Sequence, residues 1–133
     1  MKEIGKKEII TDIQEWINPR HNVVLDQTIG TRGFKKVAEL CCTYVDLVHF
    51  FGEPLKLIGA DRRVEWGFRE DQTDIAATIY DDKPDLKLDE ILYWAVGGHC
   101  DRSFEMIGQL FVEKKLEGVE FVSTELTDEE GTN

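Results

Sequence analysis

The sequence predicts an α+β fold, with a mostly antiparallel sheet of about five strands and the helices packed on one face. Two stretches, residues 43–52 and 101–115, have the spacing of amphipathic helices. Several others alternate apolar and polar residues, which is typical of half-buried strands. The resulting order of elements, α-β-β-α-β-β-β-α, favours helices gathered on one side of an antiparallel sheet.

The length and composition indicate one folded domain. The chain has 133 residues, of which 41% are hydrophobic and 32% charged, as in ordinary globular proteins. No apolar run reaches the ~20 residues that a membrane helix needs. The N-terminus lacks the apolar stretch of a signal peptide. We therefore expect a cytoplasmic protein that does not contact membranes.

Three parts of the chain are expected. Residues 1–20 form an N-terminal helix extension, residues 21–123 a single α+β domain, and residues 124–133 an acidic flexible tail. In the extension, Ile9, Ile13 and Trp16 recur at helical spacing over residues 2–17. Their apolar stripe can pack on the domain or on a second copy, and we predict a homo-oligomer.

The first half of the domain is expected to contain two strands and a helix. Residues 21–27 and 34–41 have strand patterns and are joined by a glycine-containing turn, so residues 22–41 are predicted to form a hairpin. The helix that follows has Thr43 as its N-cap and Asp46 at the third helical position. Gly52 is the natural residue to end it.

The second half is expected to contain strands at residues 64–69, 75–80 and 91–96, a helix, and a last edge strand at residues 119–122. Residues 70–74 form a polar turn, and Pro84 marks a solvent loop over residues 81–90. Apolar positions in phase with each element predict the core. It includes Leu47, Phe51, Trp66, Ile79, Trp94, Ile107 and Phe111.

The charge argues against one class of partner. The formal net charge is −11, from 27 acidic and 16 basic residues. Binding to duplex nucleic acid needs a basic face, so we do not expect it. The acidic surface is either simply solvated or a mimic of nucleic acid that occupies a protein's binding surface.

No residue set predicts catalysis, a metal or a cofactor. His21, His49 and His99 are scattered, and none of the common catalytic fingerprints is present. Cys41, Cys42 and Cys100 do not form a disulfide framework, because their number is odd and neighbouring cysteines bridge only with strain. No CxxC spacing supports a zinc site that would combine them with His99. We expect a protein that is not an enzyme, with a small enzyme as the minor alternative.

A glycine pair supplies one candidate binding element. Gly97 and Gly98 are predicted to lead from a strand into a helix, where free backbone N–H groups can meet an anion. His99 would add a donor there. The structural alternative is that the glycines only permit a sharp turn while Asp101 caps the helix.

Three aromatic residues on neighbouring predicted strands supply a second element. In one interpretation, Trp66, Tyr80 and Trp94 belong to the core beneath the helices. In the other, some of them lie on the open face of the sheet and form a stacking platform for a base. Basic residues near them could engage phosphates. They are Arg62 and Arg63 before Trp66, Lys83 after Tyr80, and Lys35 and Lys36 beside the first glycine turn.

Several ordered motifs resemble a known family. They are TYVDLVHFFGEP at residues 43–54, VEW at 64–66, ATIYDDK at 77–83 and WAVGGH at 94–99, preceded by a shortened glycine turn at 30–33. The chain resembles a family of small uncharacterised proteins encoded largely by bacteriophages and other viruses, over about residues 27–111. Asp82 departs from the pattern, since Tyr or Trp is usual there.

The resemblance implies a viral context rather than a mechanism. We therefore predict a non-enzymatic viral accessory protein that acts in the host cytoplasm and counteracts a host defence by binding. In one version it sequesters a small anionic signalling nucleotide. The ligand residues would be Arg62, Arg63, Trp66, Tyr80, Lys83, Gly97, Gly98 and His99. In the other version an acidic face inhibits a host defence protein.

Overall fold

The computed structural model describes residues 8–10, 22–29, 33–57, 62–71, 73–113 and 120–123. Helices and strands alternate along the chain. In order they are β1 (Glu8–Ile10), β2 (Val23–Leu25), β3 (Lys35–Cys41), α1 (Tyr44–Phe51), β4 (Leu55–Lys56), β5 (Val64–Glu70), β6 (Ala76–Tyr80), the 3-10 turn η2 (Leu88–Glu90), β7 (Tyr93–Gly98), α2 (Asp101–Glu113) and β8 (Glu120–Ser123).

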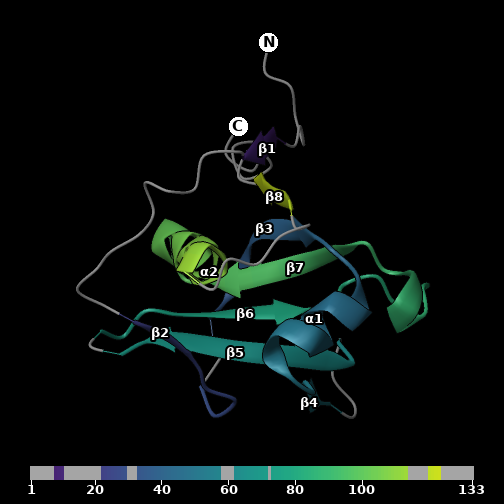
Figure 1. Cartoon of the computed structure of the whole chain (residues 1–133), viewed down its shortest axis with the longest axis horizontal. Helices are drawn as coiled ribbons and strands as arrows, with labels where there is room; N and C mark the ends of the chain where they lie inside the picture. Colours follow the sequence, from purple (N-terminus) through teal and green to yellow (C-terminus); the bar gives the residue numbers. More distant parts are fainter. Residues whose placement is uncertain are drawn as a thin grey trace.

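The described strands form one sheet in the order β1-β8-β3-β7-β6-β5-β2, with β4 beside β5 (Figure 1). Every pairing is antiparallel. Both α helices pack on the face that carries the large apolar side chains. The predicted α+β class is thus confirmed, although the sheet has eight strands instead of about five. No described helix has the length and apolar character needed to cross a membrane.

The register separates the two faces of the sheet. Trp66 lies opposite Ile79, and Ile79 opposite Val96, so these side chains share the face beneath the helices. One residue along, Glu65, Tyr80 and Ala95 form a row that continues to Glu39 on β3. Since side chains alternate along a strand, this second row lies on the side turned away from α1 and α2, which we call the outer face.

The core beneath the helices is largely the predicted one. Its largest fully buried side chains include Trp66, Trp94 and Phe111. Phe51 is only partly buried but packs on Phe68, with ring centroids 5.0 Å apart. Truncating a large side chain in such a core typically costs ~2–5 kcal/mol. The predicted residues that are buried are Leu47, Trp66, Ile79, Trp94, Ile107 and Phe111.

The ends of α1 are formed as the sequence predicts. Thr43 is the N-cap, and its hydroxyl oxygen accepts the N–H of Asp46 at 3.1 Å. Gly52 adopts φ 84° and donates its N–H to Val48 O at 2.7 Å. A long-range bond then holds this end on the sheet, because Trp66 Nε1 donates to Gly52 O at 2.9 Å.

Two predicted pairings are wrong. Residues 22–41 do not form a hairpin, because β2 pairs with β5 whereas β3 pairs with β7 and β8. The predicted edge strand at residues 119–122 is not an edge, since β8 lies between β1 and β3. In both cases the alternation of apolar residues indicates which face of the strand is buried, but it does not determine which other strand it pairs with.

The predicted N-terminal helix is wrong at Glu8–Ile10, which is strand β1 and pairs with β8. Two successive isoleucines favour a strand when another strand is available to pair. Ile13 and Trp16 lie outside the described residues, as does the acidic tail. The stripe proposed for self-association therefore lacks helical geometry at Ile9.

Gly98 ends β7 at the point where α2 crosses the sheet. A Cβ atom added to Gly98 would lie 2.3 Å from Ser103 Cβ. The Ser103 hydroxyl donates to Ala76 O at 2.8 Å, which fixes the first turn of α2 on β6. The glycine is therefore required by the close approach of α2.

We predict that Gly98→Ala destabilises the protein by about 1–3 kcal/mol in urea unfolding, because overpacking forces α2 from the sheet. In a Ser103→Gly background the same change should cost clearly less, since the nearest remaining atom is Ala76 O at 3.3 Å. An equal cost in both backgrounds would show that α2 does not approach β7 in this way.

Candidate functional site

The predicted ligand residues divide between the two faces of the sheet. Trp66 lies beneath the helices with 0% exposure, and its ring contacts Trp94 at 5.8 Å between centroids. Tyr80 lies on the outer face. The prediction that Trp66 stacks on a ligand base is therefore wrong, and the alternative that Trp66 and Trp94 are core is confirmed.

The predicted turn at Gly97 and Gly98 is also wrong. Both residues belong to β7, and both are matched to residues of β3 on one side and of β6 on the other. The backbone groups of an interior strand are directed to its two neighbours, so this pair does not form the predicted anion-binding turn. Gly97 has a packing role instead. A Cβ there would lie 3.0 Å from both Thr78 Oγ1 and Tyr80 Cε1.

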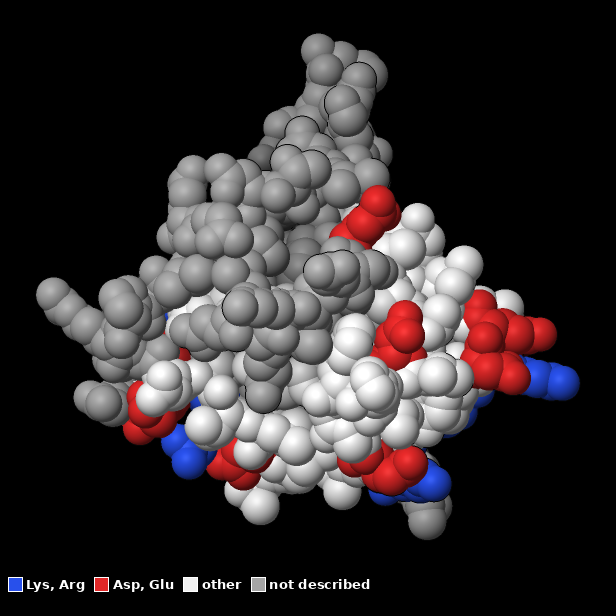
Figure 2. Space-filling view, viewed as in Figure 1, with Lys and Arg blue, Asp and Glu red and all other residues white. Residues whose placement is uncertain are grey.

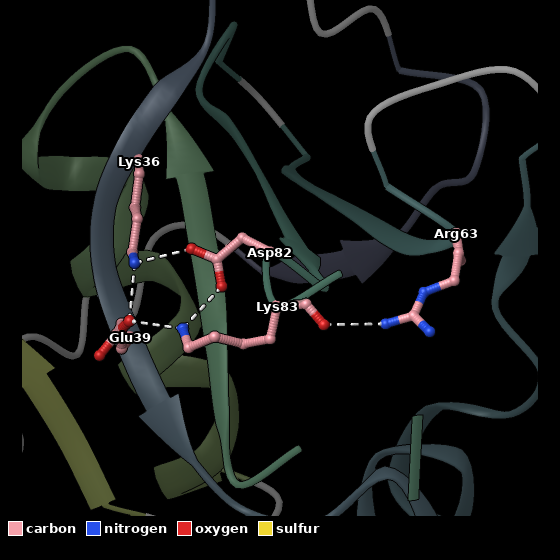
Figure 3. Close-up of polar contacts among 5 residues, drawn as sticks. All are labelled: Lys36, Glu39, Arg63, Asp82 and Lys83. Carbon is pink, nitrogen blue, oxygen red and sulfur yellow. Dashed lines mark hydrogen bonds and ion pairs between the residues drawn. The ribbon is translucent and has the colours of Figure 1, made fainter. Parts of the chain in front are cut away.

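On the outer face, two lysines and two carboxylates form a network that we call the lysine–carboxylate cluster (Figure 3). Lys36 Nζ donates to Glu39 Oε2 at 2.6 Å and to Asp82 Oδ2 at 2.8 Å. Lys83 Nζ donates to Asp82 Oδ1 at 2.9 Å and to Glu39 Oε2 at 3.4 Å. Lys36 and Glu39 come from β3, and Asp82 and Lys83 follow β6.

The ionisation of this cluster is set by competition between burial and pairing. Burial alone would lower the pKa of Lys36, but its hydrogen bonds to Asp82 and Glu39 outweigh this and raise the pKa. Burial would raise the pKa of Asp82, but the bonds from Lys36 and Lys83 lower it. Pairing thus favours the charged form of Lys36, and both lysines are directed at carboxylates of the same chain.

Arg63 is used to support the backbone. Its Nε donates to Asp81 Oδ2 at 2.8 Å, and its terminal Nη2 donates to Lys83 O at 3.2 Å (Figure 3). Asp81 is only 2% exposed and also accepts the backbone N–H groups of Arg63 and Val64. Replacing these bonds with a phosphate would leave the buried Asp81 carboxylate without its cation, which is costly.

Arg62 is likewise paired. Its Nη1 lies 2.9 Å from Glu65 Oε2, and its guanidinium carbon lies 3.7 Å from the centre of the Tyr80 ring. This cation–π contact covers the face of Tyr80 that the predicted stacking platform requires. Arg62, Arg63 and Lys83 therefore each have a carboxylate partner, and the predicted phosphate contacts are not available without breaking ion pairs.

His99 lies in a different place, in an open hollow of about 240 Å³ that we call the His99 hollow. It is lined by Ile29, Phe34, Arg69, Thr73, Asp74, Ala76 and His99. Sequence reasoning missed Arg69, Asp74 and Phe34, because no spacing or motif connects these positions with His99. Only the register, which places Arg69 opposite Ala76, brings them together.

At the opposite end of β7 the surface is acidic and partly apolar. Cys42 N–H donates to Leu92 O at 2.9 Å, which joins the start of α1 to the start of β7. Val45 and Leu92 are 69% and 53% exposed there, and Figure 2 shows acidic side chains near the η2 end with a basic side chain beside them. We define the acidic end by the residues of this surface. They are Val45, Asp46, Asp85, Leu86, Asp89, Glu90 and Leu92.

The acids of this surface differ from those of the outer face. Within the described part of the chain, Asp46, Asp85, Asp89 and Glu90 have no ion pair. One lysine of the same segment, Lys87, is exposed at the N-cap of η2, and its backbone N–H donates to Glu90 Oε1 at 3.0 Å. The acidic end thus combines four acids that have no ion pair among the described residues with exposed leucine and valine side chains.

Among the described residues, no group of three or more His, Cys, Asp or Glu side chains is arranged to hold a metal ion. The three cysteines are free. Cys41 lies opposite Tyr93 at the start of β7, whereas His99 follows the end of that strand. The zinc arrangement considered for Cys41 and His99 is excluded by this separation.

No family model, curated protein or solved structure matches the chain.

We predict that Glu39→Gln destabilises the protein by about 1–3 kcal/mol, because it leaves two lysines with a single carboxylate partner in a partly buried setting. Urea unfolding measures the loss. Glu120→Gln, on the neighbouring strand and exposed, is the matched control and should leave stability nearly unchanged. Equal effects of the two substitutions would mean that the cluster is not a structural unit.

The Asp26–Arg69 pair beside the His99 hollow predicts a pH dependence. Hydrogen bonds from the side chain and backbone of Thr28, followed by that from Arg69, lower the pKa of Asp26 to about 2. Its contribution to stability is present above the ordinary pKa of 3.8 and is lost as the pH falls toward 2. Asp26→Asn should therefore flatten the stability profile between about pH 4 and pH 2. Asp85→Asn serves as control, and an unchanged profile for Asp26→Asn would refute the assignment.

Proposed function

We propose that this protein is a non-enzymatic viral accessory protein that counteracts a host defence by binding a host protein through its acidic end. The carrying observation is the contrast between two sets of charges. Arg62, Arg63 and Lys83, three cations predicted to hold a nucleotide, are paired with carboxylates. The acids of the acidic end have no ion pair in the described structure.

The charge distribution supports a basic partner. A net charge of −11 attracts a positively charged protein over long range and repels an anionic nucleotide. Uncompensated acids at a surface favour complementary lysine and arginine residues on a partner and speed its association. The acidic end therefore fits a host protein's nucleic-acid-binding surface better than it fits an anion.

The exposed apolar side chains support a protein partner over simple solvation. Leu92 and Leu86 are 53% and 38% exposed, and Val45 stands beside Asp46 on the first turn of α1. Interfaces combine a desolvated apolar centre with a polar rim. Leucine and valine surrounded by four acids have this composition, which a merely solvated acidic face does not require.

The viral role rests on the resemblance of residues 43–54, 77–83 and 94–99 to small viral proteins. Small accessory proteins of viruses often act against host defences, and the step from origin to role is an analogy. In this setting the protein works in the host cytoplasm, where its target is a host defence protein.

The test compares two charge reversals of equal size. Asp89→Lys lies in the acidic end, and Glu53→Lys is an exposed control outside it. Affinity capture from host lysate, with quantification of the retained proteins, should show about tenfold less of the target with Asp89→Lys and little change with Glu53→Lys. Leu92→Ser should also weaken capture.

Salt and stability complete the design. Capture by the unmodified protein should weaken as ionic strength rises, because screening reduces attraction between exposed charges. Each variant should unfold at the temperature of the unmodified protein, since all three sites are exposed. Equal losses with Asp89→Lys and Glu53→Lys would mean that net charge alone matters. Full capture by both Asp89→Lys and Leu92→Ser would exclude the acidic end.

A further inference from the structure

The His99 hollow contains polar groups whose hydrogen-bonding capacity is not fully used by the described residues. Arg69 donates its Nε to Asp26, while its terminal nitrogens have no hydrogen bond among the described residues. Asp74 and His99 have none either in the part of the chain that the structure describes. The His99 ring makes an edge-to-face contact with Phe34, with 4.6 Å between the ring centroids. The hollow thus offers donors, an acceptor and an aromatic wall.

The cation of the hollow is held in place before any ligand arrives. Asp26 Oδ2 accepts Arg69 Nε at 2.7 Å, and Asp26 Oδ1 accepts the Thr28 N–H at 2.9 Å. Gly67 allows this segment to cross the outer face, because a Cβ there would lie 2.6 Å from Asp26 O. A group fixed in this way loses little freedom on binding. Since Asp26 already balances its charge, Arg69 is suited to a neutral acceptor.

Asp74 supplies a negatively charged hydrogen-bond acceptor; it is exposed and precedes β6. No ion pair joins Asp74 to Arg69 in the described structure, so a ligand between them can meet both. A volume of about 240 Å³ is below the range of sites for drug-sized ligands and suits one ring system. Ile29, Phe34 and Ala76 supply the apolar contact for such a ring.

We propose that the His99 hollow binds a guanine base. Guanine has two acceptors, O6 and N7, which an arginine recognises with its terminal nitrogens. It also carries N–H donors at N1 and N2, which a carboxylate such as Asp74 accepts. Adenine replaces the O6 acceptor with an amine donor, and inosine lacks the N2 donors. The hollow therefore distinguishes guanosine from both.

The base rather than the phosphate is the recognised part. Among the described lining residues, those other than Arg69 and His99 are neutral or acidic, and the whole chain carries −11. A phosphate would approach against this field. Of the residues predicted for a nucleotide, only His99 belongs to the hollow, and none of its lining belongs to the acidic end. The inference is therefore independent of the proposed function.

The experiment titrates guanosine, inosine and adenosine into the full-length protein and follows the backbone amide signals by NMR. Guanosine should shift the amides of Asp74, Ala76 and His99. Inosine should bind about tenfold more weakly, since a hydrogen bond to a charged group is lost, and adenosine should bind at least as weakly as inosine. Guanosine monophosphate should bind no more tightly than guanosine.

Two substitutions locate the site. Asp74→Asn should weaken guanosine binding about tenfold, whereas Asp71→Asn, outside the hollow, should leave it unchanged. His99→Ala removes part of the aromatic wall and should also weaken binding, by about tenfold or more. Asp74 is exposed and has no partner to lose among the described residues. Asp74→Asn should therefore be folded, and thermal unfolding checks this.

Three results would overturn the proposal. The first is no shift of these amides at millimolar guanosine. The second is equal binding of guanosine and adenosine, which would indicate a non-selective apolar hollow. The third is unchanged guanosine binding by Asp74→Asn.

Discussion

The arrangement of charged side chains on the outer face of this sheet depends on one fully buried carboxylate. Glu39 is 0% exposed on β3, and a buried charge is tolerated only when it is paired. Lys36 and Lys83 supply the pairing, and Asp82 in turn holds both lysines. The cluster thereby ties β3 to the segment that follows β6, across the central strand β7.

This constraint limits which of the described cations are available to an anion. Because the outer-face cations are directed at carboxylates, the surface they form is nearly balanced and offers little to an anion. Among the described residues, acids without an ion pair lie at the acidic end, and polar groups with remaining hydrogen-bonding capacity lie in the His99 hollow. The two surfaces are at opposite ends of β7, a strand of six residues, or roughly 20 Å apart. The proposed protein partner and the proposed guanine ligand would therefore bind at separate sites.

The sequence predicts those parts of the structure that depend on local chemistry. Thr43 and Gly52 end α1 as expected, and the polar turn at residues 70–74 joins β5 to β6. Prediction from the sequence fails where contacts between segments far apart in the chain determine the structure. Gly97 and Gly98 are typical of a turn, but Tyr80 and Ser103 require them within a strand. The cluster joins Lys36 to Asp82, 46 positions apart, and no pattern in the sequence connects them.

The central claim is that the outer-face lysines are held by carboxylates of the same chain and do not bind anions. Nitrogen-15 NMR of the lysine ammonium groups tests it directly. The Lys36 ammonium group should stay protonated to a higher pH than an ordinary lysine. The signals of Lys36 and Lys83 should not move when millimolar phosphate or adenosine diphosphate is added. Shifts of both lysine signals in the unmodified protein on addition of either anion, at least as large as that of the exposed Lys56, would contradict the account.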